Sequence, residues 1–147
     1  MKKLIFSLLV ASALLVSFAF GKSAKNEEPE ESEPTSNLIK NGDFSKGKKF
    51  WDMFLSNGSA DQLVTENGEM EIRIKNPGPY EYAIQPYFDG FSLYKGGVYK
   101  YSFDVHSSIE RTFEWRLQVN GRDYHAYVGG CDSVGKETKH IETTFTM

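Results

Sequence analysis

Polar side chains that can bridge neighbouring hydroxyl groups recur at alternate positions in two segments of this chain. Glu114, Arg116 and Gln118 are two residues apart, and Gln85 and Tyr87 have the same spacing. Alternate residues of a β-strand lie about 7 Å apart on one face, so each set would share a surface. Carboxylate, guanidinium and amide groups suit adjacent hydroxyls because each makes two directed hydrogen bonds. An ordinary solvated sheet face, with Glu114 and Arg116 in an exposed ion pair, is the alternative interpretation.

Patterns typical of catalysis are weak. The three histidines lack metal-ligand spacing, and Cys131, the single cysteine, lies outside any nucleophile motif. Asp104 or Glu110 could form a glycosidase pair with Glu114, which requires two carboxyl groups roughly 5–10 Å apart, but the chain is small for such an enzyme. We therefore expect a binding protein without catalytic activity.

Alternation with period two identifies the elements that would position these groups. Apolar residues alternate with polar ones over 99–105, 113–119 and 70–74, and more weakly over 141–147. Trp115 shares the apolar parity of its segment, which places it in the core. Many short strands separated by turns predict an all-β antiparallel sandwich. The expected turns are at Asn57-Gly58, Asn67-Gly68, Asn76 to Pro79, Asp89-Gly90, Gly96-Gly97, Asn120-Gly121 and Gly129-Gly130.

The N-terminal region predicts export. Lys2 and Lys3 precede an apolar stretch that ends near Phe20, and small residues follow, so residues 1–21 are expected to be a cleaved signal peptide. A membrane anchor is the alternative, but the stretch is shorter than the roughly 20 residues that span hydrocarbon and contains serines. Residues 22–36 are rich in Glu and Pro and predict a disordered acidic linker before a domain at 37–147.

Charge and cysteine content argue against a nucleic acid partner and against an internal disulfide. The formal net charge is −3, and much of it comes from the linker. The domain lacks the clustered Lys and Arg that a phosphate backbone requires, so we expect no nucleic acid partner. A single cysteine excludes an internal disulfide, so the domain depends on core packing, aided at most by a metal ion.

Several segments together resemble extracellular carbohydrate-binding modules of the family 4, 9 and 22 type. No segment is specific alone, but their order and spacing match over nearly everything after Asn37. The segments are Asn37 to Phe44 with Trp51, Tyr82 to Pro86, Gly96 to Asp104 and Arg111 to Gln118.

The resemblance implies a jelly roll of two antiparallel sheets, of the galactose-binding-domain type. Its concave polar face would be a groove for glycan chains, with flat aromatic rings against the C–H faces of the sugars. It further implies that Trp51 packs under the sandwich edge, with a place in the groove as the alternative. The binding residues that we predict are Gln85, Tyr87, Tyr82, Arg116, Gln118, Glu114 and Tyr127.

The resemblance also bears on a metal and on the end of the chain. Asp43 matches a position where many such modules bind structural calcium, although a turn-stabilising aspartate is the preferred interpretation. No cofactor is required otherwise. In the family, further strands would follow Met147, so the closing strands are expected to be missing and the edge at residues 38–44 unpaired.

The resulting hypothesis is a secreted or cell-surface module that binds β-glucan or xylan chains. A glycoside hydrolase, in the same chain or the same secretome, would be its partner, and no membrane span would remain after signal cleavage. The alternative is a structural or adhesive cell-envelope sandwich that makes protein contacts. The acidic linker and the expected unpaired edge would suit that role.

Overall fold

The structure, a computed structural model, describes residues 2–7 and 37–147 and is built from strands without helices in those ranges. No helix among these residues is long and apolar enough to cross a membrane. The strands are β1 (Lys2–Ser7), β2 (Trp51–Leu55), β3 (Ser59–Val64), β4 (Met70–Asn76), β5 (Ile84–Phe88), β6 (Val98–Ser107), β7 (Arg111–Gln118), β8 (Ala126–Val134) and β9 (Lys139–Thr146).

One layer is a five-stranded sheet in the order β3-β4-β1-β6-β9, with every neighbouring pair antiparallel. The longest pairing joins β6 to β9, from Val98 opposite Thr146 to Val105 opposite Lys139. The alternation expected for 99–105 is confirmed: Tyr99, Phe103 and Val105 are buried on the face toward the second layer.

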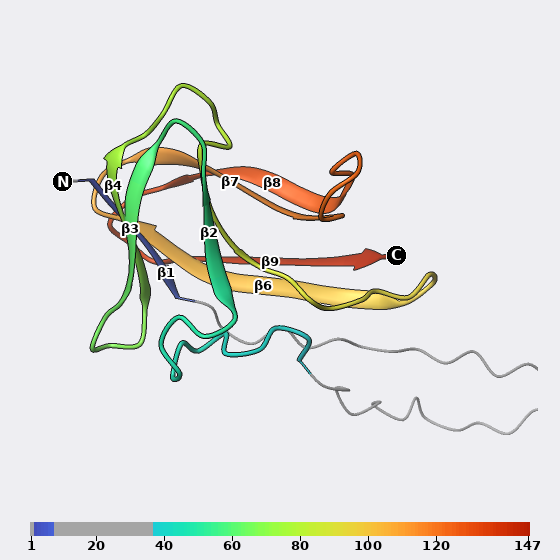
Figure 1. Cartoon of the computed structure of the whole chain (residues 1–147). Coiled ribbons are helices and arrows are strands. Elements are labelled where there is room, and N and C mark those ends of the chain that lie inside the picture. The colour runs from blue at the N-terminus through green and yellow to red at the C-terminus, as the bar shows by residue number, and fades with distance from the viewer. Residues whose placement is uncertain (1, 8–36) are drawn as a thin grey trace, which may run out of the picture.

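The second layer consists of two separate hydrogen-bonded pairs, β2–β5 and β7–β8. Figure 1 shows β7 and β8 running alongside β6 and β9 in a layer of their own. A bulge interrupts the β7–β8 register between Leu117 and Gln118, so that Val128 and Ala126 are their respective partners and Tyr127 is the extra residue. The arrangement confirms the predicted all-β sandwich.

Aromatic rings from both layers meet in the core. Phe103 is 1% exposed, and its ring lies 5.7 Å from that of Trp115 and 6.0 Å from that of Phe113, both in edge-to-face geometry. Burial of such a ring stabilises the fold by about 1.5–3 kcal/mol. Trp115 therefore belongs to the core as expected, and its indole N–H donates to Asp132 Oδ2 at 2.8 Å.

The first turn also supplies core residues. Phe44 is 2% exposed, and its ring lies 5.3 Å from that of Trp51, which in turn contacts Phe88 at 5.6 Å. The indole N–H of Trp51 donates to the carbonyl oxygen of Asn41 at 3.1 Å. Trp51 thus packs beneath the sandwich edge, the preferred interpretation from the sequence.

The prediction of an edge strand at residues 38–44 is wrong, because this segment folds into consecutive bends and turns. The side chain of Asn41 donates to the carbonyl oxygens of Gly47 and Lys49 and accepts from the amide of Lys46, all at 2.9 Å. Asn41 and Phe44 both have φ above 50°. Left-handed φ values and side-chain hydrogen bonds of this kind replace the ladder that a strand needs.

A second correction concerns Gly129-Gly130, which lies inside β8 rather than in a turn. A Cβ on Gly129 would approach the Trp115 carbonyl oxygen to 2.8 Å, and one on Gly130 would approach the Trp115 ring to the same distance. These glycines allow close approach of a neighbouring strand and side chain. Positive φ values at Asn57, Gly68, Gly78, Gly96 and Gly121 agree with five of the other predicted turns. Gly90 also has a positive φ, but residues 89–94 form an extended irregular segment without a turn, so the turn predicted at Asp89-Gly90 is wrong.

Residues 2–7 of the expected signal peptide form β1, at the centre of the five-stranded sheet. The remainder of that peptide and the linker at 22–36 lie outside the described residues. Cleavage after residue 21 stays a prediction.

Candidate functional site

The outer face of β2–β5 carries two aromatic and two polar side chains in a compact square. Phe54 lies opposite Gln85, and Asp52 lies opposite Tyr87, in the antiparallel register. Trp51, Met53 and Ile84, on the opposite face of the two strands, pack against the core. Asp52, Phe54 and Tyr87 are exposed, and Gln85 is half-buried. Phe54 is 48% exposed and Tyr87 is 39% exposed. The aromatic residues occupy one diagonal of the square and the polar residues occupy the other, within reach of one ligand.

A stacked tyrosine pair flanks this square at the turn that leads into β5. The rings of Tyr80 and Tyr82 lie 5.2 Å apart with planes 2° from parallel, and both residues are about half exposed. The Gln85 side-chain amide donates to the carbonyl oxygen of Tyr82 at 2.8 Å. This bond orients the amide and ties the turn to the strand, so Gln85 and Tyr82 are positioned together.

The outer face of β7–β8 carries charged side chains that pair with each other. Arg116 and Glu114 form an ion pair in which both side chains are more than a third exposed. The alternative interpretation from the sequence, an exposed pair on a solvated face, describes this contact well, and such pairs contribute little to stability. Gln118 is half-buried at the bulge end of the same face, and Tyr127 is half-buried with its ring edge-on to His125 at 5.7 Å.

The seven predicted binding residues therefore fall on two strand pairs, β2–β5 and β7–β8, and on the turn before β5. One hydrogen bond, from Asn120 Nδ2 to Asp89 Oδ2 at 3.1 Å, links the turn after β7 to the end of β5. Two hollows of the described surface lie elsewhere. One is beside Glu110 and Glu137, and the other is an apolar crevice near Leu38 and Leu117. None of the seven residues lines either hollow.

Asp43 uses its carboxylate within its own turn. Its Oδ1 accepts from the Ser45 hydroxyl at 3.0 Å and from the Ser45 amide at 3.3 Å. These hydrogen bonds, led by the one from the amide, lower the pKa of Asp43. Within residues 37–147 and 2–7, no group of three His, Cys, Asp or Glu side chains is arranged to hold a metal ion.

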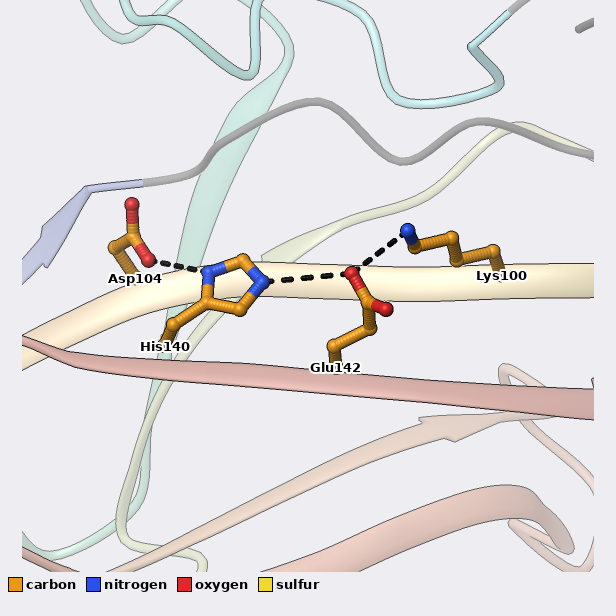
Figure 2. A network of polar contacts seen from close by, with 4 residues as sticks. All are labelled: Lys100, Asp104, His140 and Glu142. Atoms are coloured by element: carbon orange, nitrogen blue, oxygen red, sulfur yellow. Dashed lines mark hydrogen bonds and ion pairs between the residues drawn. The ribbon is translucent and has the colours of Figure 1, made fainter.

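The five-stranded sheet carries a chain of polar contacts across β6 and β9 (Figure 2). His140 Nδ1 lies 2.6 Å from Asp104 Oδ1, and Glu142 Oε2 lies 3.5 Å from His140 Nε2 and 2.7 Å from Lys100 Nζ. The hydrogen bond to Asp104 is the main cause of a raised pKa at His140, and the Lys100 contact lowers the pKa of Glu142. These groups belong to the five-stranded sheet, so they are separate from the β2–β5 face.

Exposed aromatic rings beside directed polar groups on a β-sandwich suit a saccharide-binding protein, and the comparisons with known proteins agree. A model of the family CBM_4_9, described as "Carbohydrate binding domain", matches residues 36–147. The chain belongs to this family of non-catalytic carbohydrate-binding domains, as the sequence predicted.

A solved structure described as "CBM4 structure and function" has the same fold, with a TM-score of 0.66. It is 22% identical, and the alignment covers 74% of this chain and 78% of that one. No curated protein matches the chain significantly.

Sequence reasoning missed Phe54, Asp52 and Tyr80. In β2, Trp51 and Met53 pack against the core, and Asp52 and Phe54 are exposed. The sequence does not show this parity, because four of the five residues of the strand are apolar and Phe54 is among them. The stacking of Tyr80 on Tyr82 could not be predicted either, because both residues lie in a turn whose path no periodicity fixes.

Proposed function

We propose that this protein is a secreted, non-catalytic module that binds β-linked glucan or xylan chains across the outer face of β2–β5. The observation that carries the proposal is the square in which the exposed Phe54, Tyr87 and Asp52 lie beside the half-buried Gln85. Large rings left in solvent on a strand pair that packs against the core on its other face are typical of a surface that a ligand covers.

Binding would combine stacking with hydrogen bonding. β-linked glucose and xylose rings carry equatorial hydroxyls, so their C–H faces are flat and can lie on the rings of Phe54 and Tyr87. An aromatic contact of this type is worth about 0.5–1.5 kcal/mol beyond the area that it buries. Gln85 and Asp52 would bridge hydroxyls at the rim of the same sugar units, at a net gain of roughly 0.5–1.5 kcal/mol per hydrogen bond.

The neighbouring β7–β8 face would extend the site. Arg116 keeps guanidinium donors beyond those used by Glu114, and Gln118 and Tyr127 lie toward the bulge end of the same hairpin. A glycan chain that crosses from β2–β5 to β7–β8 would contact both sets. Tyr82, with Tyr80 stacked on it, would border the β2–β5 face.

The proposed biological role is proximity. A module that holds an insoluble polysaccharide raises the local concentration of substrate for a glycoside hydrolase in the same chain or the same secretome. Export is supported by Lys2, Lys3 and the apolar stretch after them, and it would place the protein outside the cell or at its surface. Binding would need no cofactor, and a calcium ion at Asp43 would act on stability only.

Isothermal titration of the protein against xylan, barley β-glucan, laminarin and soluble cellulose derivatives tests this function. We expect heat with at least one of them, and unchanged affinity when a chelator is added. Thr144→Ala, an exposed position on β9 of the five-stranded sheet, serves as a control for general damage. No heat with any glycan, from protein whose thermal transition is cooperative, would contradict the proposal.

A further inference from the structure

A small cluster of lysines lies at the turns that lead into β2. Residues 40–50 contain four lysines and one aspartate, a formal charge of +3 in a chain whose net charge is −3. The four lysines, all exposed, are Lys40, Lys46, Lys48 and Lys49. None of them forms an ion pair with a described residue, and the aspartate, Asp43, bonds to Ser45 instead. Figure 1 shows this segment looped at the start of β2, so unpaired positive charge borders the β2–β5 pair.

Two of these ammonium groups lie over one exposed aromatic ring. Lys49 Nζ is 5.2 Å and Lys40 Nζ is 5.8 Å from the centroid of the Phe50 ring, and Phe50 is 45% exposed. Asn41 brings the two lysines together, because it follows Lys40 directly and its side chain donates to the Lys49 carbonyl oxygen at 2.9 Å. Cation–π attraction is weak at an exposed ring, but it keeps both charges within reach of a molecule that covers Phe50.

The backbone of Phe50 has a conformation that a bulky residue does not favour. Its φ is +74°, and it is the third residue of a turn that the Trp51 amide closes by donating to the Lys48 carbonyl oxygen at 2.9 Å. Gly or Asn usually occupies such a position, because a Cβ is crowded there. Residues strained in this way cluster at ligand-binding and active sites. An aromatic ring at a position that suits Gly therefore points to a use for the ring itself.

An exposed ring with ammonium groups beside it matches a sugar that carries a carboxylate. The C–H face of a uronic acid can stack on Phe50, while the carboxylate at its rim accepts hydrogen bonds from the lysines. A phosphate backbone would occupy more cations, spread over a longer surface, than this turn provides. An acidic peptide would use the lysines but has no flat C–H face for the ring. A uronic acid uses both features.

We propose that Phe50, Lys40 and Lys49 form a subsite for a uronic acid unit of the bound glycan, at the end of the β2–β5 face. Phe50 directly precedes β2, and Asp52 of the β2–β5 square is two residues further on. The carboxylate of Asp52 would repel a second carboxylate over the square, which confines the acidic unit to the Phe50 end. The inference rests on the proposed glycan function and refines it, because it assigns a preference for acidic over neutral chains.

Titration with matched oligosaccharides tests the preference. One pair is xylohexaose and the same backbone with a single glucuronic acid branch. The other pair is cellohexaose and the same chain oxidised to carboxylate at C6. We expect the acidic member of at least one pair to bind about fivefold more tightly at low salt. The affinity ratio should fall toward one in about 0.5 M NaCl, because salt screens exposed charges.

Lysine variants show whether the preference is local. Lys40→Gln with Lys49→Gln should reduce the acidic-to-neutral affinity ratio to about one, whereas Lys40→Arg with Lys49→Arg should keep it, since Arg retains the charge. The matched control, Lys95→Gln with Lys136→Gln, removes the same charge from exposed positions elsewhere and should leave the ratio unchanged. Phe50→Asn, which tolerates a positive φ, should lower the affinity for the acidic chains about fivefold. Thermal unfolding of each variant checks the fold.

Three results would overturn the proposal. They are equal affinity for both members of each pair, a ratio that survives Lys40→Gln with Lys49→Gln, and hexaglutamate that binds as tightly as the acidic oligosaccharides. The last result would assign the lysines to an acidic protein partner. If neutral chains bind and acidic chains bind no better, the subsite fails while the β2–β5 proposal stands. If no chain binds, both fail.

Discussion

The outer faces of the two strand pairs, β2–β5 and β7–β8, differ in how their side chains use their contacts. On β7–β8, Arg116 and Glu114 form an ion pair with each other. On β2–β5, Phe54 and Tyr87 expose large ring surfaces, and Gln85 is oriented by a backbone carbonyl. On the β7–β8 face, charged groups already pair with each other. The β2–β5 face instead leaves apolar ring surface in water beside an oriented amide.

The difference shows why a pattern of polar residues is a weak guide to a binding surface. Glu114, Arg116 and Gln118 have the alternation of a ligand-binding row, but alternation alone does not show which groups are already paired. Exposed rings are more informative, because a ligand that covers them removes apolar surface from water and so gains binding free energy. We therefore expect the β2–β5 face to contribute more to glycan affinity than the β7–β8 face.

The largest effect should come from removing both rings of the β2–β5 face. The double variant Phe54→Ala, Tyr87→Ala should weaken binding of the preferred glycan by about 2–3 kcal/mol, roughly 30- to 150-fold, because two stacking contacts are lost. Titration calorimetry measures the affinity, and thermal unfolding of the same sample checks the fold. Affinity within threefold of the parent protein would remove the distinction between the faces.

The next-largest effect is expected on the stability of the fold, where β8 packs against Trp115. Gly130→Ala places a Cβ where the Trp115 ring now lies, at 2.8 Å, so the indole must shift in a packed core. We expect the free energy of unfolding to fall by about 2 kcal/mol. Urea denaturation followed by Trp fluorescence measures it.

Ser133→Ala, an exposed position on the same strand, is the matched control for Gly130→Ala and should change the unfolding free energy by less than about 0.5 kcal/mol. Equal stability of the two variants would mean that the close approach of β8 to Trp115 is not tight in solution.

A smaller effect on affinity is expected from the β7–β8 face itself. Arg116→Ala with Gln118→Ala should weaken glycan binding by about 1 kcal/mol, roughly fivefold, with an unchanged thermal midpoint. The loss is modest because Arg116 already pairs with Glu114. Affinity equal to that of the parent protein would exclude both residues from the site, and a loss larger than that of the ring variant would reverse the comparison.

The smallest effect should come from the far side of the sandwich. The contact with Asp104 raises the pKa of His140, so the stabilisation from protonated His140 is fully present below the ordinary histidine pKa. That stabilisation is lost as pH rises through the raised value.

The thermal midpoint of the parent protein should accordingly exceed that of His140→Gln at about pH 6, and the difference should shrink toward pH 9. The effect is small because the His140 side chain is 49% exposed. Glycan affinity should be the same in both proteins at each pH. A difference in midpoint that grows with pH would contradict the assigned contact.

The sandwich could be predicted from the sequence because its strands are half-buried and alternate. Tyr99 to Val105 and Phe113 to Gln118 have one apolar and one polar face, and both formed strands as expected. The segment at 38–44 misled because Asn41 satisfies three backbone groups by itself, which converts an apparent strand into turns.

The candidate site could be predicted only in part. Gln85 and Tyr87 followed from parity, but the partners that complete their square come from a strand more than 30 residues earlier. Only the cross-strand register brings Phe54 beside Gln85. For Glu114 and Arg116 the sequence left two interpretations open, and the structure shows the exposed ion pair that was the alternative.

The most direct test of the central claim is a titration of isotope-labelled protein with a soluble glucan or xylan oligosaccharide, followed by backbone amide chemical shifts. We predict that the largest shifts cluster at Asp52, Phe54, Gln85 and Tyr87, with smaller ones at Arg116 and Gln118. Shifts confined to β3, β4 or β9, with none on β2 or β5, would contradict the account.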